Sequence, residues 1–173
     1  MIDLVSIASH MLFLLVGATI TGLASYLFRT EGAAAAIARE QAARKLALME
    51  ELAHQAGIAH QSFQRYFTLV QEAIRFKENW PRQRREELDA ISLQLVEAIN
   101  QLATAESTLL LLHEKLLSKA LRNYTNRIAT FKKSQYARSD ASDEVLNEQK
   151  QQIIALRDKF FELLSERYSR KDL

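Results

Sequence analysis

The sequence contains no cysteine, and only four glycines and one proline occur among its 173 residues. The lack of cysteine excludes a disulfide scaffold, a thiolate zinc site and a cysteine nucleophile. So few turn-forming residues do not suffice for an all-β sandwich or a multi-stranded α/β sheet, because such folds turn repeatedly. Hydrophobic residues make up 48% of the chain, which is too many for a disordered protein. The composition therefore predicts an all-α fold of a few long helices.

Charged residues are missing from one long segment at the N-terminus. No Asp, Glu, Lys or Arg occurs between Leu4 and Phe28. As a helix this segment rises about 37 Å, enough to cross a hydrocarbon core of about 30 Å. We therefore expect residues 1–29 to form a transmembrane anchor and residues 30–173 to form a separate helical body.

The charges that flank the segment predict its orientation. Only Asp3 and the α-amine precede it, whereas Arg29, Arg39, Arg44 and Lys45 follow it. By the positive-inside rule, the N-terminus lies outside and the body lies in the cytoplasm. The sequence thus predicts a single-pass protein of the inner (cytoplasmic) membrane. A cleaved signal peptide and a buried bundle helix remain as alternatives, although a signal peptide would have a cationic start and a shorter apolar core.

Small residues follow one side of the predicted span at helical spacing. These residues are Gly17, Ala18, Thr21, Gly22 and Ser25. In lipid, small side chains let two helices approach closely, and hydroxyl groups can hydrogen-bond across the contact. The pattern predicts a packing face for a second span. The alternative is a chance cluster, since these residue types are common in transmembrane helices.

Two interruptions divide the body into three predicted helices. The residue before Pro81 is forced out of the helical region, and Pro is favourable in the first turn of a new helix. A cluster of capping residues follows at 139–143. We therefore expect helices at about 30–78, 81–138 and 143–170, the first of them continuous with the span.

Each predicted helix carries an apolar repeat of three and four residues, which is typical of coiled-coil-like packing. In 81–138 the repeat changes to steps of four residues after Leu112, which we interpret as a stutter in a continuous helix. Additional apolar residues such as Leu93, Leu110 and Leu111 broaden the stripe, as a bundle of three or more helices requires. The predicted fold is a long antiparallel hairpin plus a third, shorter helix, a three-helix bundle. Since the third helix is short, part of the hairpin would stay uncovered and favour association.

The hairpin predicts a cluster of positive charge near the membrane. If the chain bends near residue 80, residue 130 lies beside residue 30. That register would gather a basic collar against anionic headgroups of the inner leaflet. The collar comprises Arg29, Arg39, Arg44, Lys45, Lys115, Lys119, Arg122, Arg127, Lys132 and Lys133. The alternative is a solvated face of paired charges; a nucleic-acid partner is disfavoured because the aromatic residues fit core positions.

The sequence offers no catalytic, cofactor-binding or metal-binding motif, and it predicts a protein that is not an enzyme. The four glycines stand apart, and no two of the four histidines are four residues apart. Trp80, at the bend, either caps the hydrophobic end of the hairpin or serves as a candidate anchor for a partner.

These features predict a membrane-anchored structural or adaptor protein that forms a homo-oligomer or docks on another membrane-associated protein. The alternative is a defence or lysis effector that multimerises and permeabilises the inner membrane. A further alternative has the body outside the cytoplasm.

Overall fold

The computed structural model describes the backbone of residues 4–135 and 142–169, and the side chains of residues 35–134 and 142–169. The chain divides into two compact units, residues 1–45 and residues 46–173. Four α-helices are described: α1 (Leu4–Phe76), α2 (Arg82–Leu111), α3 (Lys115–Gln135) and α4 (Asp143–Ser169). A 3-10 turn, Lys77–Asn79, joins α1 to α2. The all-α prediction is confirmed.

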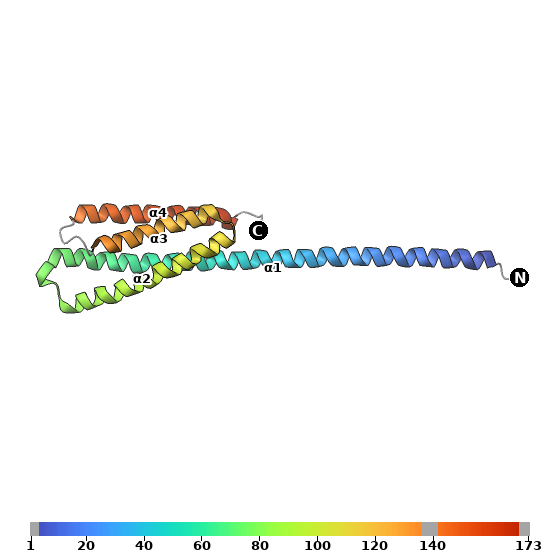
Figure 1. Ribbon diagram of the computed structural model, residues 1–173, viewed down its shortest axis with the longest axis horizontal. Coiled ribbons are helices and arrows are strands. Elements are labelled where there is room, and N and C mark those ends of the chain that lie inside the picture. The colour runs from blue at the N-terminus through green and yellow to red at the C-terminus, as the bar shows by residue number, and fades with distance from the viewer. Residues whose placement is uncertain (1–3, 136–141, 170–173) are drawn as a thin grey trace. The chain divides into compact units, whose positions relative to one another are not determined.

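In the second unit, the last part of α1 packs with α2, α3 and α4 as a four-helix bundle in which successive helices alternate in direction (Figure 1). Phe131 of α3 packs edge-to-face on Phe63 of α1, with ring centroids 5.5 Å apart. At one end of the bundle, Arg75 of α1 pairs with Asp143 of α4 at 3.0 Å. At the other end, Tyr168 donates a hydrogen bond to Glu50 at 3.2 Å.

Most of the core consists of residues at the three- and four-residue spacing of the apolar repeat. α1 contributes Met49, Leu52, Ala56, Ala59, Phe63, Phe67 and Val70; α2 contributes Ile91, Leu95, Ala98, Leu102, Ala105 and Leu109; α4 contributes Leu146, Ile153, Phe160 and Leu164. All of these side chains are buried in the structure. Among the residues whose side chains are described, the core lies within residues 46–173, so each helix of this unit buries its apolar side against the others.

A new helix begins after each of the two predicted interruptions, α2 at Arg82 and α4 at Asp143. Trp80 has an extended backbone before Pro81, which stands at the N-cap of α2. At the start of α4, the Ser142 hydroxyl accepts a hydrogen bond from the backbone N–H of Val145 at 3.4 Å. Asp143 and Glu144 then place negative charge in the first turn of α4.

The predicted continuous helix over 81–138 is wrong, because the chain reverses at Leu112–Glu114. His113 adopts a left-handed backbone with φ of 59°. The Glu114 N–H bonds to the Leu109 carbonyl at 2.9 Å, which closes the turn. The change of step that we interpret as a stutter is therefore the start of another helix. Leu116, which follows Leu112 by one step of four residues in the predicted continuous repeat, is 64% exposed, whereas Leu117 is buried.

The turn at Leu112–Glu114 also changes the predicted number of helices. The described part of the body is a four-helix bundle and not a three-helix bundle, so the long hairpin that was expected to stay partly uncovered does not form. Phe131 lies against Phe63 and Phe67. The expected register, in which residue 130 lies beside residue 30, is therefore wrong as well.

Substitution of His113, whose backbone is left-handed, tests the turn between α2 and α3. Since a left-handed backbone is costly for His and free for Gly, His113→Gly should raise the free energy of unfolding by about 0.5–1 kcal/mol. Gln101→Gly, at an exposed position inside α2, should lower it by about 1 kcal/mol. Urea unfolding followed by the fluorescence of the single tryptophan measures both changes. Destabilisation by His113→Gly would contradict the turn.

Among the residues whose side chains are described, no helix is long and apolar enough to cross a membrane. The predicted span, residues 4–28, lies outside these residues.

Candidate functional site

The residues predicted to pack spans together have no described side chains. Gly17, Ala18, Thr21, Gly22 and Ser25 all lie in this part of α1, as does Arg29 of the predicted collar. Their roles therefore stay predictions.

Trp80 lies at the end of the bundle that carries the α1–α2 connection, and its side chain is buried at 6% exposure. It belongs to the same core cluster as Val70 and Ile91. A side chain buried in this way has little surface to offer a partner, so the expected partner anchor is wrong. Trp80 instead closes the hydrophobic end of the bundle, the other role weighed for it.

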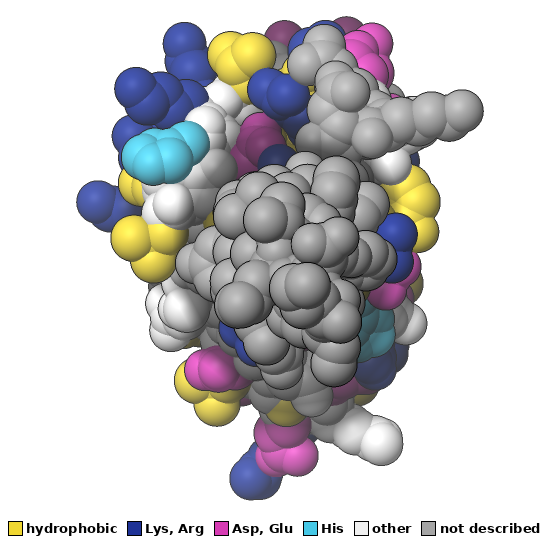
Figure 2. Space-filling model, turned by 90° about the vertical axis from the view of Figure 1, so that its right-hand side faces the viewer, with side chains coloured by type: hydrophobic (Ala, Val, Ile, Leu, Met, Phe, Trp, Pro, Cys, Tyr) yellow, Lys and Arg dark blue, Asp and Glu magenta, His cyan; other side chains and the backbone are white. Residues whose placement is uncertain are grey.

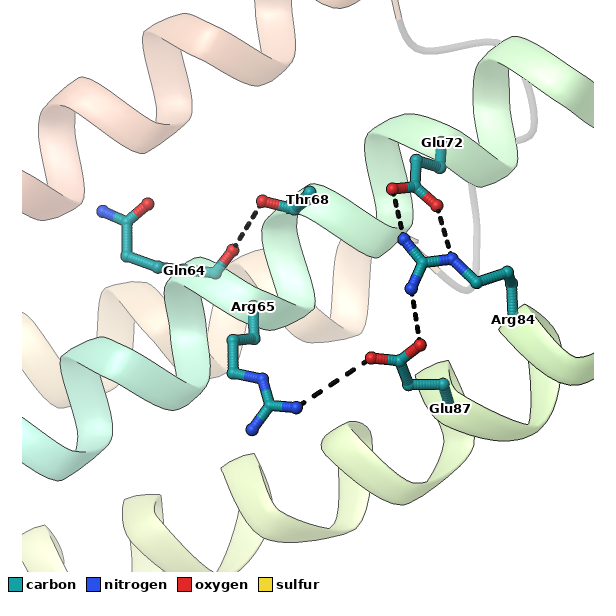
Figure 3. A network of polar contacts seen from close by, with 6 residues as sticks. All are labelled: Gln64, Arg65, Thr68, Glu72, Arg84 and Glu87. Carbon is teal, nitrogen blue, oxygen red and sulfur yellow. Dashed lines mark hydrogen bonds and ion pairs between the residues drawn. The ribbon is translucent and has the colours of Figure 1, made fainter.

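A network of charged side chains links α1 to α2 close to this end (Figure 3). Arg84 donates two hydrogen bonds to Glu72, from Nε at 3.0 Å and from Nη2 at 2.5 Å. Its third nitrogen donates to Glu87 at 2.6 Å, and Glu87 also faces Arg65 at 3.9 Å. The hydrogen bonds from Arg84 hold the pKa of Glu72 below its ordinary value of 4.5.

This network predicts a pH-dependent contribution to stability. Because the pKa of Glu72 is lowered in the folded protein, its contribution is present above pH 4.5 and is lost as the pH falls through the lowered value. Glu72→Gln should therefore cost about 1–2 kcal/mol at neutral pH and almost nothing in strong acid. Urea unfolding at both pH values measures this difference, with Glu51→Gln, at an exposed position elsewhere on α1, as the matched control. A cost that is equal at both pH values would contradict the network.

A polar contact joins α1 to α3 at the edge of the core. The hydroxyl of Tyr124 lies 3.5 Å from Nδ1 of His60, and His60 also contacts Gln64 at 3.1 Å. Burial lowers the pKa of His60 and raises the pKa of Tyr124. Both groups are thereby kept neutral at physiological pH, which suits their place in the core.

Within the second unit, the basic residues that the collar takes from α3 face different neighbours. Arg122 of α3 pairs with Glu106 of α2 at 2.5 Å, and Arg127 donates a hydrogen bond to Gln152 of α4. Lys132 and Lys133 line a hollow between α2 and α3. In the first unit, Arg44 pairs with Glu40 at 2.6 Å, while Arg39 is exposed and Lys45 is half-buried.

Lys115 and Lys119 are exposed at the start of α3, beside the α2–α3 turn. Figure 2 shows the molecule from the side on which this turn lies, with Lys and Arg gathered at the upper left among hydrophobic side chains. Because α3 turns back at residue 113, the other basic residues of α3 lie progressively farther along the bundle. The collar therefore rests on a register that the structure does not have.

An exposed apolar stripe on α2 was not predicted from the sequence. Leu93, 73% exposed, and Leu110, 45% exposed, do not extend the core as expected. Val96 lies between them at 37% exposure. The three side chains stand on the outer side of α2, away from Leu95 and Leu102. The sequence does carry the signal for this stripe, because these positions form a second repeat out of phase with the core repeat.

Among the described residues, no group of three or more His, Asp or Glu side chains is arranged to hold a metal ion. Comparisons with protein-family models, curated proteins and solved structures found no match to this chain.

Proposed function

We propose that this chain is a single-pass membrane-anchored structural or adaptor protein. Residues 4–28 form the anchor, the N-terminus lies outside, and the four-helix bundle works in the cytoplasm as an assembly module without catalytic activity. The observation that carries the proposal is the absence of charged residues from Leu4 to Phe28, in a chain whose core, among the described side chains, lies within residues 46–173. An anchor that is separate from the core can enter a bilayer without removing any helix from the bundle.

The bundle supports an assembly role through its surface. Its core is closed by its own four helices, so that the apolar side chains left outside are available for contact with another protein. Leu93 and Leu110 of α2 are the clearest examples. In the anchor, the small residues from Gly17 to Ser25 favour a second helix–helix contact inside the bilayer. Two weak contacts on one chain strengthen each other, because the first raises the effective concentration for the second.

Orientation can be tested with a reporter fused after Leu173. A reporter that is active only in the cytoplasm should be active, because the positive charges after residue 28 keep the body inside. Activity of a periplasmic reporter at this position would contradict the orientation.

An effector that permeabilises the membrane would share the anchor and the self-association. Leakage of a small dye from cells that express the chain separates the two functions. We expect the membrane to stay intact. Leakage at expression levels that leave an unrelated single-pass control protein harmless would contradict an adaptor.

A further inference from the structure

The outer side of α2 carries a second heptad repeat, distinct from the repeat that fills the core. Its six positions follow one another in steps of three, four, three, four and three residues. They are Leu93, Val96, Asn100, Ala103, Ser107 and Leu110, and all six are exposed. This spacing keeps one side of a helix facing a partner helix over the whole length of the repeat, about 27 Å.

The composition of this α2 seam suits a close and specific contact between helices. None of its six residues is charged. Leucines stand at both ends, while Ala103 and Ser107 are small enough for close approach of the backbones. Asn100 occupies the first core position of its heptad, where Asn pairs with Asn in parallel two-stranded coiled coils and fixes the register.

The surroundings of the seam are complementary in charge between two copies of the bundle. On the α3 side of the seam, Lys133 lines a hollow of about 330 Å³ together with Val96 and Ile99. On the opposite side stands the exposed Glu97, which accepts a hydrogen bond from Gln101, a residue that lines a hollow between α1 and α2. In a parallel coiled coil, the g positions that flank the seam on one helix face the e positions that flank it on the other helix. Lys133 of one copy therefore approaches Glu97 of the second copy, and the two-fold symmetry repeats this contact.

Parallel pairing also agrees with the direction of the chain. Glu50 bonds Tyr168 and Arg167 bonds Glu114, so the bundle begins at the end that carries the α2–α3 turn. In a parallel pair, the ends that carry the α2–α3 turn lie side by side in the two copies. Antiparallel pairing would place these two ends on opposite sides of the pair, so parallel pairing suits two chains that the proposed anchors hold in one membrane.

We propose that the α2 seam is the self-association surface of this protein and that it binds a second copy of the chain in parallel and in register. This inference deepens the proposed function, because it names the partner and the contact through which the anchored bundles assemble.

The absence of cysteine permits a direct test by cross-linking in the full chain in membranes. Ala103→Cys should form a disulfide-linked dimer on mild oxidation, because parallel pairing places the two copies of residue 103 opposite each other. Gln94→Cys, also exposed on α2 but outside the seam, is the matched control and should stay monomeric. A mixture of Leu93→Cys chains and Leu110→Cys chains, distinguished by size, should yield only links between identical chains.

Variants of the seam test the energetics in detergent by energy transfer between labelled full chains. Ala103→Glu should raise the dissociation constant at least about tenfold, since two like charges would face each other. Because the position is exposed, the bundle should stay folded, as tryptophan fluorescence reports. Glu97→Lys and Lys133→Glu should each weaken dimers by about threefold, and their combination should restore them.

The outcomes separate this inference from the proposed function. Links between Leu93→Cys and Leu110→Cys chains would show antiparallel pairing and overturn the inference. The absence of Ala103→Cys dimers in chains that stay membrane-bound in alkaline carbonate would also overturn the inference. It would leave the proposed function as an anchored adaptor unaffected. Specific Ala103→Cys dimers in chains released by carbonate would support the seam and contradict the anchor.

Discussion

Phe131→Ala should lower the free energy of unfolding by about 3–5 kcal/mol, the largest effect expected from a single substitution in this bundle. The side chain is 1% exposed. It contacts three aromatic rings of α1, namely Phe63 at 5.5 Å, Phe67 at 5.7 Å and Tyr66 at 6.3 Å between centroids. Removing it loses the burial of the ring, leaves a cavity between α1 and α3, and ends these ring contacts.

The chain offers a matched control for this substitution. Phe76 is 54% exposed at the end of α1, so Phe76→Ala should cost less than about 1 kcal/mol. Both values follow from urea unfolding detected by the fluorescence of Trp80, which lies in the bundle and is the only tryptophan of the chain. Equal effects of the two substitutions would contradict the return of α3 along α1.

Arg167→Ala should cost about 2–3 kcal/mol, although the substituted residue is on the surface side of α4. Arg167 pairs through Nε with Glu114 at 3.1 Å. The side chain of Glu114 is only 8% exposed, at the turn between α2 and α3. Without the guanidinium, the buried carboxylate loses a charge-assisted hydrogen bond, and such bonds to a charged group contribute about 1.5–3 kcal/mol.

A double substitution distinguishes this cause from lost packing. Glu114→Gln removes the charge, so the cost of Arg167→Ala should fall to less than half in the Glu114→Gln background. Lys159→Ala, which removes an exposed pair with Glu162 within α4, serves as the control and should cost less than about 1 kcal/mol. An unchanged cost in the double variant would contradict the ion pair.

The core was predictable from the sequence because it depends on periodicity alone. Residues such as Leu95 and Leu102 recur at heptad spacing whichever helices they contact, so the repeat identified them without knowledge of the fold. The start of α2 was predictable for a local reason, since Pro81 restricts the residue before it. Ser142 and Asp143 likewise mark the start of α4 by their side-chain chemistry.

The reversal at His113 was not predictable from such signals. Residues 109–117 contain neither Gly nor Pro and are rich in leucine, a strong helix former. Only the change of phase between Leu112 and Leu117 marks the turn, and a stutter in a continuous helix produces a similar change. Tertiary packing decided between the two, because turning back lets α3 bury Tyr124 and Phe131 against α1.

The turn at His113 explains why the predicted register of α3 is wrong. The collar was predicted from one long hairpin, so its α3 residues were expected side by side with the first helix near the membrane. Once α3 turns back, the lysines of α3 separate. The α2 seam was overlooked for a related reason, since Leu93 and Leu110 were assigned to a broad core stripe that a hairpin with one short helix would require.

If one anchor holds one self-contained bundle at the membrane, extraction with alkaline carbonate should separate the full chain from a chain that lacks the anchor. Membranes from cells that express the full chain are compared with those from cells that express a chain starting at residue 35. We expect the full chain to stay in the membrane pellet, whereas the shorter chain is released with the protected tryptophan fluorescence of a folded bundle. Release of the full chain by carbonate would contradict the anchor.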